Sequence, residues 1–254
     1  MIRNFAALIF LAALALTGAH SGNAQTVAEQ YLVQLTNQHR AEHGLAPLTW
    51  DAALATAART HAMRVMREPS VEHQYAGEPD LTARASQAGA HFSTVAENLA
   101  GGNGTLASID RAWMESPTHR ANILDPHLTT IGIAVVPSGG TFYAVEDFAR
   151  QTPTLRPSDI EKRVNELLRA NGIHPNTDRA ALADARTNCA LPNEITGHPR
   201  LVMQWDGADL NQLPTAVLQQ MPTARSGTVA IGACPGQNPA NDGFTTYHVA
   251  VLLY

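Results

Sequence analysis

The strongest constraint on how this chain can fold is a stretch of sequence that occurs twice. Residues 37–62 and 165–190, aligned without a gap, are identical at ten of twenty-six positions. Six of these matches are Ala or Leu, which a shared preference for helix could produce alone. The Asn, Gly and Pro matches are harder to explain in this way. We therefore predict two copies of one structural plan, with helical composition bias as the alternative.

Later parts of the chain agree with a duplication. Ile131-Gly132 recurs as Ile231-Gly232 in a second strand-like run, and the second copy is about thirty residues shorter in its middle. Residues 151–157 contain two prolines and are predicted to be a linker. The predicted organisation is a signal peptide at 1–24, a first domain at 25–150, the linker at 151–157, and a shortened, degenerate second domain at 158–254.

The N-terminus has the pattern of a secretory signal peptide. A short positive start is followed by the apolar run Phe5–Leu16 and by small residues before Gln25. The apolar run is too short to span a bilayer comfortably. The alternative is an anchor that stays uncleaved. No cysteine lies at the cleavage point, so we expect a secreted or periplasmic protein that does not span the membrane after signal removal.

Charge and cysteine content narrow the function. The net charge is −5 and no block of basic residues occurs, which gives no support for nucleic-acid binding. The two cysteines, Cys189 and Cys234, lie in an exported chain, where a single disulfide is expected. The alternative is two buried thiols. Neither cysteine has a spacing typical of a metal site.

Local patterns predict helices followed by strands in the first copy. Thr26 and Glu29 form a capping box that opens a helix ending near Gly44. Another helix ends before Pro69, and residues 105–115 are helical. Two strand-like runs, 130–136 and 141–148, flank a hairpin at 138–140. This order predicts an α+β fold with helices on an antiparallel sheet.

Ser158 and Glu161 form a second predicted capping box at the start of the second copy. Near the end of the first copy, Glu146 and Asp147 lie in a strand-like run. We interpret these two acids as part of a solvated strand face.

The segment from Ala112 to Leu124 places a glutamate and a histidine four residues apart with a proline between them. Pro117 is incompatible with one continuous helix, so Glu115 is predicted to end a helix and Ser116 to cap the next. Their side chains could then face one cleft from two segments. His73 and Glu97 also fall near the ends of helix-like segments, where side chains can converge.

At these positions the sequence resembles a known family. The segment 37–51 resembles the first motif of the CAP superfamily, which comprises cysteine-rich secretory, antigen 5 and pathogenesis-related 1 proteins and is also called the SCP domain. The resemblance covers about residues 28–150. The other matching segments are Glu97–Ala100, Trp113–Leu124, Ile131–Ala134 and Tyr143–Phe148.

The resemblance implies an α-β-α sandwich with an antiparallel sheet and a cleft. It also implies a site of two histidines and two glutamates, which here correspond to His73, Glu97, Glu115 and His119. His91 is a rival for the first histidine because it is closer in sequence to Glu97. His73 is preferred because the residues after it fit the stretch that usually follows the histidine of the family.

These residue types suit a divalent cation, with zinc the first expectation. Neutral imidazole is a good ligand for zinc-like ions, and two histidines alone leave about two tetrahedral positions to water. Glu97 and Glu115 could orient the imidazoles or act as a base. The alternative is a metal-free hydrogen-bonded cluster. The second copy has no evident matches for these residues, and Cys189 stands at the counterpart of His61.

Three functions remain open. The first is an extracytoplasmic binding or effector module with a divalent-cation site, whose partner is a lipid, sterol, glycan or envelope component. The second is a zinc-dependent hydrolase that uses metal-bound water, with Glu97 or Glu115 as the base. The third is a structural envelope protein with a relic site. The absence of H-E-x-x-H and G-x-S-x-G sequences disfavours the second.

Overall fold

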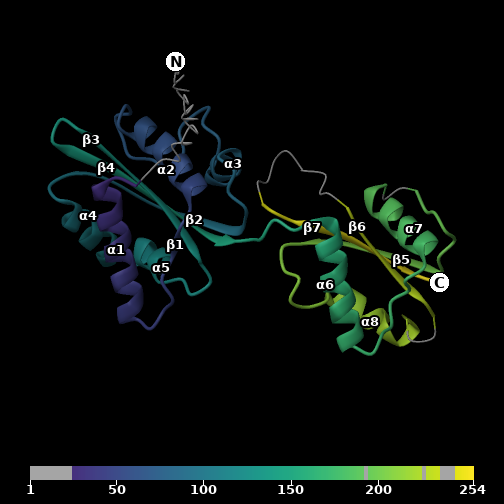
Figure 1. Cartoon of the computed structure of the whole chain (residues 1–254). Coiled ribbons are helices and arrows are strands. Elements are labelled where there is room, and N and C mark those ends of the chain that lie inside the picture. Colours follow the sequence, from purple (N-terminus) through teal and green to yellow (C-terminus); the bar gives the residue numbers. More distant parts are fainter. Residues whose placement is uncertain (1–24, 192–193, 225–226, 235–243) are drawn as a thin grey trace, which may run out of the picture.

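The chain forms two lobes, each with its own sheet, helices and hydrophobic core (Figure 1). The structure is a computed structural model that describes residues 25–191, 194–224, 227–234 and 244–254. The predicted signal peptide lies outside the described residues. No helix in the described part of the chain is long and apolar enough to cross a membrane.

The N-terminal lobe is built on a four-stranded sheet in the order β1-β3-β4-β2. Strand β1 is parallel to β3, and the other two pairings are antiparallel. Strand β2 therefore forms one edge of the sheet. The strands are β1 (Thr49–Trp50), β2 (Phe92–Asn103), β3 (Thr130–Ser138) and β4 (Thr141–Gln151).

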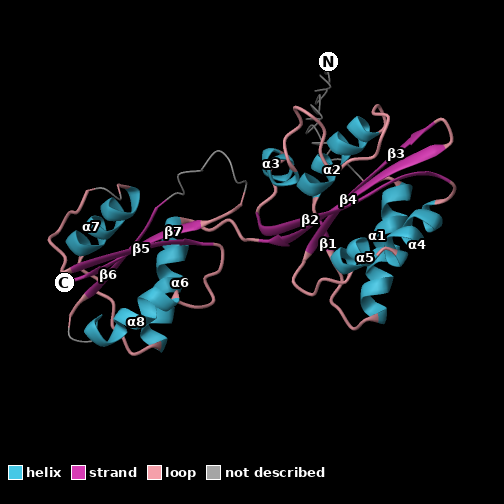
Figure 2. Ribbon diagram, turned by 180° about the vertical axis from the view of Figure 1, so that it is seen from behind, coloured by secondary structure: helices cyan, strands magenta, loops and turns pink. Residues whose placement is uncertain are grey.

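Helices cover both faces of this sheet, which confirms the predicted α+β sandwich. Figure 2 shows α2 and α3 on one face and α1, α4 and α5 on the other. The helices are α1 (Val27–Glu42), α2 (Ala52–Val65), α3 (Leu81–Gln87), α4 (Leu106–Glu115) and α5 (Pro117–Ile123). With both faces covered, the central strands must bury consecutive residues, because neither face is left to solvent.

Side-chain caps explain where the first helices begin and end. The predicted capping box at Thr26 and Glu29 is present, with each side chain accepting from the other residue's backbone N–H. Gly44 follows α1 with a φ of 71°, a conformation that favours glycine. Asp51 accepts from two backbone N–H groups at the start of α2.

The core of the N-terminal lobe lies on both sides of the sheet. Leu32, Trp113 and Phe148 are buried between the sheet and α1, α4 and α5. On the opposite face, α2 lies directly on the sheet at Gly132. A Cβ atom there would stand 2.1 Å from the backbone nitrogen of Ala55, so only glycine permits this approach.

The C-terminal lobe repeats the order of the sheet in a smaller form. Its three antiparallel strands run β5-β7-β6, and Pro175 adds an isolated parallel bridge to β6. That bridge occupies the place that β1 has beside β3. The elements are α6 (Pro157–Ala170), α7 (Arg179–Ala190), β5 (Leu201–Gly207), α8 (Thr215–Ala224), β6 (Val229–Cys234) and β7 (Tyr247–Leu253).

The second predicted capping box is wrong. Helix α6 begins at Pro157, one residue before Ser158, with Arg156 at the N-cap and no side-chain cap bond. The fixed φ of proline suits the first helical position, so the helix starts there. Glu161 instead forms two hydrogen bonds with Arg186 of α7, both at 2.7 Å.

The predicted disulfide is present. Cys189 at the end of α7 is bonded to Cys234 at the end of β6, across a sequence separation of 45 residues. The bond therefore fixes a helix to the sheet of the C-terminal lobe.

The lobes meet where the start of β2 lies beside the segment before β7. The backbone N–H of Thr245 donates to the carbonyl of Phe92 at 2.8 Å, and its hydroxyl accepts from the N–H of Phe92 at 3.2 Å. The Phe92 and Phe244 rings meet edge to face with their centroids 5.6 Å apart. Edge strand β2 is thus attached to the C-terminal lobe at its first residue.

Candidate functional site

The break at Pro117 has the predicted form. Helix α4 ends at Glu115 and α5 begins at Pro117, with Ser116 at the N-cap position. The Ser116 side chain makes no cap hydrogen bond, so the extended backbone at Ser116 and the proline turn the chain. His119 lies in the first turn of α5, which packs beside β2.

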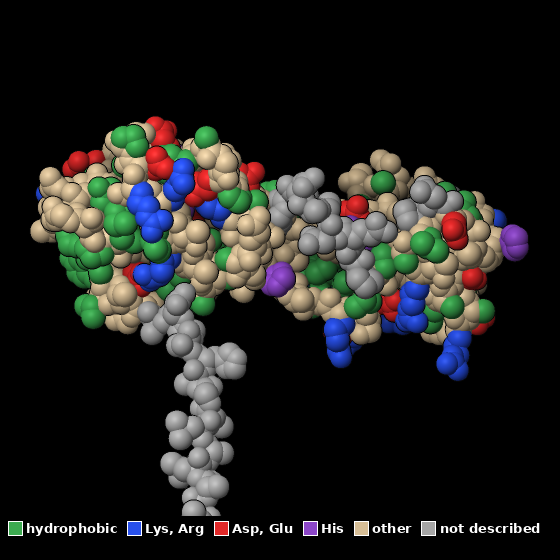
Figure 3. Space-filling view, turned by 90° about the horizontal axis from the view of Figure 1, so that it is seen from above, with side chains coloured by type: hydrophobic (Ala, Val, Ile, Leu, Met, Phe, Trp, Pro, Cys, Tyr) green, Lys and Arg blue, Asp and Glu red, His purple; other side chains and the backbone are tan. Residues whose placement is uncertain are grey.

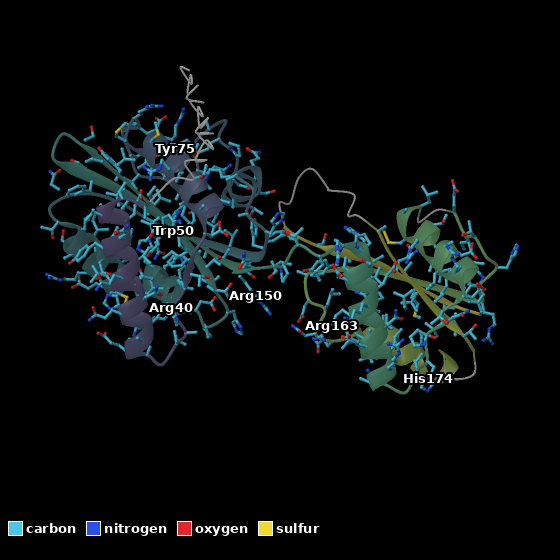
Figure 4. The ribbon with its side chains drawn as sticks, viewed as in Figure 1. Arg40, Trp50, Tyr75, Arg150, Arg163 and His174 are labelled. Atoms are coloured by element: carbon cyan, nitrogen blue, oxygen red, sulfur yellow. A yellow bond between two sulfur atoms is a disulfide. The ribbon has the colours of Figure 1, made fainter. Side chains whose placement is uncertain are left out.

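The first sequence motif fixes α5 in place. Arg40 of α1 is buried and donates from Nη1 to the carbonyls of Ile123 and Asp125, at 2.9 and 2.8 Å (Figure 4). Asn37 binds the backbone of Leu48 in both directions, at 3.1 and 2.8 Å. Arg40 therefore positions the end of the helix that carries His119, and Asn37 ties α1 to the chain before β1.

His73 and Glu97 are in direct contact. The Nδ1 of His73 lies 2.7 Å from Oε1 of Glu97. His73 comes from the loop between α2 and α3, whereas Glu97 belongs to the edge strand β2. The expectation that Glu97 lies near the end of a helix-like segment is therefore wrong. The hydrogen bond to Glu97 raises the pKa of His73, although partial burial opposes this effect.

Arg84 completes the support of Glu97. Its Nη2 donates to Oε2 of Glu97 at 2.6 Å, and both side chains are 3% exposed. Arg84 also donates from Nη1 to the carbonyls of His73 and Pro79, at 3.2 and 3.1 Å. One guanidinium therefore holds both the carboxylate and the backbone of the histidine that contacts it.

His119 lies on α5, close enough to His73 for the charge of one ring to act on the other. Burial lowers the pKa of His119, and the nearby charge of His73 lowers it further. His119 is therefore neutral at neutral pH, which is the form that binds metal ions. Asn98 donates to the carbonyl of His119 at 3.2 Å, and Asn122 donates to the carbonyl of Glu97 at 3.2 Å. These bonds tie α5 to β2.

Glu115 stands apart from these contacts. It is exposed at the end of α4, and no hydrogen bond or ion pair within the described residues uses its carboxylate. Of the four predicted site residues, the structure therefore joins His73 to Glu97, places His119 near His73, and leaves Glu115 unbonded.

The rival histidine, His91, lies at the contact between the lobes. It is exposed, and its Nδ1 is 3.4 Å from the Thr245 hydroxyl. His73, not His91, is the histidine bonded to Glu97.

Sequence reasoning missed His61 as part of the site. His61 is fully buried on α2, with Nδ1 2.8 Å from Oε1 of Glu78 and Nε2 3.1 Å from the carbonyl of Glu72. Its Nε2 also lies 3.9 Å from Oε2 of Glu97. The helical spacing from Leu54 already places His61 on the buried face of α2 and could have identified it.

The interpretation of Glu146 and Asp147 as a solvated strand face is wrong. Both side chains are completely buried, because helices cover both faces of β4. Asp147 lies opposite Glu97 in the β2–β4 pairing, and Glu146 lies opposite Asn98. The two acids therefore extend the polar cluster from the edge strand into the sheet.

The two buried acids differ in their surroundings. Glu146 accepts from the Thr36 hydroxyl at 2.6 Å and from Asn98 at 3.1 Å, yet burial raises the pKa of Glu146 to about 7. Neither oxygen of Asp147 has a hydrogen-bond partner in the described residues. Burial, together with the negative charge of Glu97, raises the pKa of Asp147 well above its usual range.

Two histidines, His73 and His119, are the donors that this part of the lobe offers to a cation. Within the described residues, no group of three or more His, Cys, Asp or Glu side chains is arranged to hold a metal ion. His73 and His119 would be the protein ligands, with the remaining positions left to water. Glu97 on Nδ1 of His73 is the arrangement that fixes the tautomer of a metal-binding histidine and leaves Nε2 for the metal.

Comparison with known proteins shows which family the N-terminal lobe is similar to. Residues 33–148 match the family model of CAP, the Cysteine-rich secretory protein family. An uncharacterized protein of Bacillus subtilis, YkwD, is 36% identical over 114 residues, which are 44% of this chain and 43% of YkwD. The uncharacterized membrane protein YlbC of the same organism is 29% identical over 111 residues, which are 44% of this chain and 32% of YlbC.

Among solved structures, an extracellular SCP-domain protein of Bacillus anthracis is 25% identical with a TM-score of 0.46, covering 49% of this chain and 40% of that one. An outer surface protein of Borrelia burgdorferi is 21% identical with a TM-score of 0.46, covering 49% of this chain and 92% of that one. The chain spans less than half the length of both YkwD and YlbC. The similarity to known proteins therefore concerns the N-terminal lobe.

Proposed function

From the match of residues 33–148 to the CAP family model, we propose that the chain is an extracytoplasmic binding or effector module with a divalent-cation site. The proposed ligands are His73 and His119, and the first candidate ion is zinc. The observation that carries the proposal is the 2.7 Å contact between Nδ1 of His73 and Glu97, near a second histidine whose pKa is lowered.

The neighbouring residues have distinct roles in this proposal. Glu97 orients His73, and Arg84 holds the Glu97 carboxylate in place by pairing with it. Asn98 holds the backbone of His119 against the edge strand. A bound zinc ion would supply a Lewis acid and a water of lowered pKa. The protein supplies one imidazole held by Glu97 and a second on a helix whose backbone is bonded to β2.

A second candidate function is hydrolysis with Glu115 as the base. The observation that favours it is the exposed and unbonded carboxylate of Glu115, in the segment that turns into the helix of His119. Glu97 is less suited to this role, because His73 and Arg84 occupy both of its oxygens. A general base needs a lone pair directed at the proton that it removes.

The proposed location is secreted or periplasmic. The disulfide between Cys189 and Cys234 supports this location, because such bonds persist in oxidising compartments. A lipid, sterol, glycan or envelope component remains the proposed class of partner.

Zinc titration by calorimetry tests the proposal. We expect one-site binding by the purified chain and its loss in the His73→Ala, His119→Ala double variant. His127→Ala is the matched control, because His127 is exposed on the loop after α5. Equal binding by all three proteins, or binding by none, would overturn the metal site and leave a hydrogen-bonded cluster.

Zinc-dependent turnover separates the two functions once binding is established. Loss of turnover in Glu115→Gln with retained zinc affinity would favour the hydrolase. Zinc binding without turnover, in a screen of ester and peptide substrates, would favour the binding module. Unchanged stability in chelator, with neither binding nor turnover, would favour a structural envelope protein.

A further inference from the structure

A depression lies on the outer side of α2, away from the sheet. Its volume is about 280 Å³, and its lining comes from one stripe of α2 and the loop that follows. The lining residues are Thr60, Arg64, Arg67, Ala76, Gly77 and Glu78. Figure 3 looks onto the end of the N-terminal lobe where Figure 4 places Tyr75, and it shows arginine side chains gathered among carboxylates there.

The two arginines of this depression are differently engaged. Arg64 pairs with Glu68 at 2.7 Å, and its guanidinium carbon lies 5.7 Å from the centre of the Tyr75 ring. These contacts hold Arg64 in one place over the loop. Arg67 is exposed, and no hydrogen bond or ion pair within residues 25–191 or the other described segments uses its guanidinium. Arg67 therefore has its full set of donors available.

The one carboxylate in the lining is directed to partners inside the lobe. Glu78 accepts from His61 Nδ1 at 2.8 Å through Oε1 and from the Tyr75 backbone N–H at 3.1 Å through Oε2. Both oxygens are thus bonded within the protein, so neither is left for the arginines. The depression therefore offers more hydrogen-bond donors than free hydrogen-bond acceptors.

We propose that this depression binds an oxyanion group, of phosphate or sulfate type, between Arg64 and Arg67. The planar guanidinium matches the oxygens of such groups with paired hydrogen bonds. The Thr60 hydroxyl in the lining donates to the carbonyl of Thr56 at 3.0 Å, so the two guanidinium groups are the donors for the anion. The site is separate from the histidine pair and does not depend on the proposed cation. The group could arrive as a free anion or as the headgroup of an anionic lipid.

Calorimetric titration with inorganic phosphate tests the site. The full chain is first treated with chelator, so that phosphate cannot bind through a metal, and the ionic strength is kept low to limit screening. We expect binding that weakens about tenfold in Arg67→Gln and disappears in Arg64→Gln, Arg67→Gln. Arg111→Gln is the matched control, because Arg111 is exposed on the opposite face of the same lobe.

A second arm separates the two sources of the group. Sedimentation with vesicles of phosphatidylglycerol, compared with phosphatidylcholine, reports binding to a lipid headgroup. Binding only to phosphatidylglycerol, weakened in Arg67→Gln and lost in the Arg64→Gln, Arg67→Gln double variant, would support the site with a lipid as the source. Binding of free phosphate alone would support it with a soluble anion as the source. No binding in either arm, or binding unchanged in the double variant, would overturn the proposal; thermal melting confirms that each variant is folded.

Discussion

The two lobes carry different residues at the same positions of similar sheets. In the N-terminal lobe, Asp147 pairs with Gly132 on one side and Glu97 on the other. In the C-terminal lobe, Ala250 pairs with Gly232 and Gln204 in the same way. Both glycines lie against a helix backbone, where a Cβ atom would come within 2.1 Å.

The next pair of residues along the two sheets also differs in polarity between the lobes. Asn98 and Glu146 are paired in the N-terminal lobe, whereas Trp205 and Val249 are paired in the C-terminal lobe. At the end of the second helix, the sequence counterpart of His61 is Cys189, which forms the disulfide. A sheet of this order therefore does not need a polar interior. Burying acids and histidines costs free energy, and only the N-terminal lobe does so at these positions of the sheet.

The largest expected effect comes from the buried ion pair of the N-terminal lobe. Arg84→Ala should cost about 3–5 kcal/mol of unfolding free energy, because it leaves Glu97 buried without its cation. An ion pair of the C-terminal lobe joins Glu161 of α6 to Arg186 of α7, whose side chain is 54% exposed. Arg186→Ala should cost only about 1 kcal/mol. Urea unfolding of both variants checks this, and equal losses would remove the contrast between the lobes.

The disulfide should stabilise the C-terminal lobe alone. The Cys189→Ala, Cys234→Ala double variant should lose about 2–4 kcal/mol in that lobe, because the bond closes a long loop. Hydrogen exchange resolved by segment measures each lobe separately. Protection should fall in α7 and β6 and stay unchanged in β3 and β4. Loss of protection throughout the chain would show that the lobes unfold as one unit.

Much of this architecture could be predicted from local patterns. The capping box at Thr26, the hairpin at 138–140 and the break at Pro117 each depend on a few adjacent residues, and each is present. The disulfide also followed from the presence of two cysteines in a chain with a predicted export signal. Residues 33–148 match the CAP family model, whereas a duplication with a degenerate second copy stays a prediction.

The polar interior was not predicted, because burial of a strand depends on the whole fold. Glu146 and Asp147 look like surface residues until helices are known to cover both faces of β4. The capping box at Ser158 failed because Pro157 starts the helix one residue earlier. Glu97 was placed near a helix because the edge strand β2 has no clean alternation of apolar residues.

The buried acid Glu146 should make stability depend on pH. Its pKa is raised to about 7, so between about pH 4.5 and 7 the folded state holds a proton that the unfolded chain releases. Stability contributed by this group is therefore lost as pH rises through that range. Glu146→Gln should stabilise the chain by about 1–3 kcal/mol at pH 8 and have little effect at pH 4.5.

The glutamine fits because its amide can donate to the Thr36 hydroxyl while its oxygen accepts from Asn98. Thermal melting of both proteins from pH 4.5 to 8 measures the difference. Glu166→Gln is the control, since Glu166 is exposed on α6. A constant difference at all pH values would show that Glu146 does not titrate in this range.

The smallest expected effect concerns the bond that joins the lobes. Thr245→Val removes the hydroxyl that accepts from the Phe92 N–H, while the backbone bond in the other direction remains. We expect a loss of about 0.5–1.5 kcal/mol. If the edge strand β2 transmits this change, backbone amide hydrogen exchange should accelerate at Phe92. The acceleration should decrease along the strand toward Glu97, and zinc affinity should stay unchanged. Weaker zinc binding in Thr245→Val would instead show that the C-terminal lobe helps to hold the strand on which Glu97 orients His73.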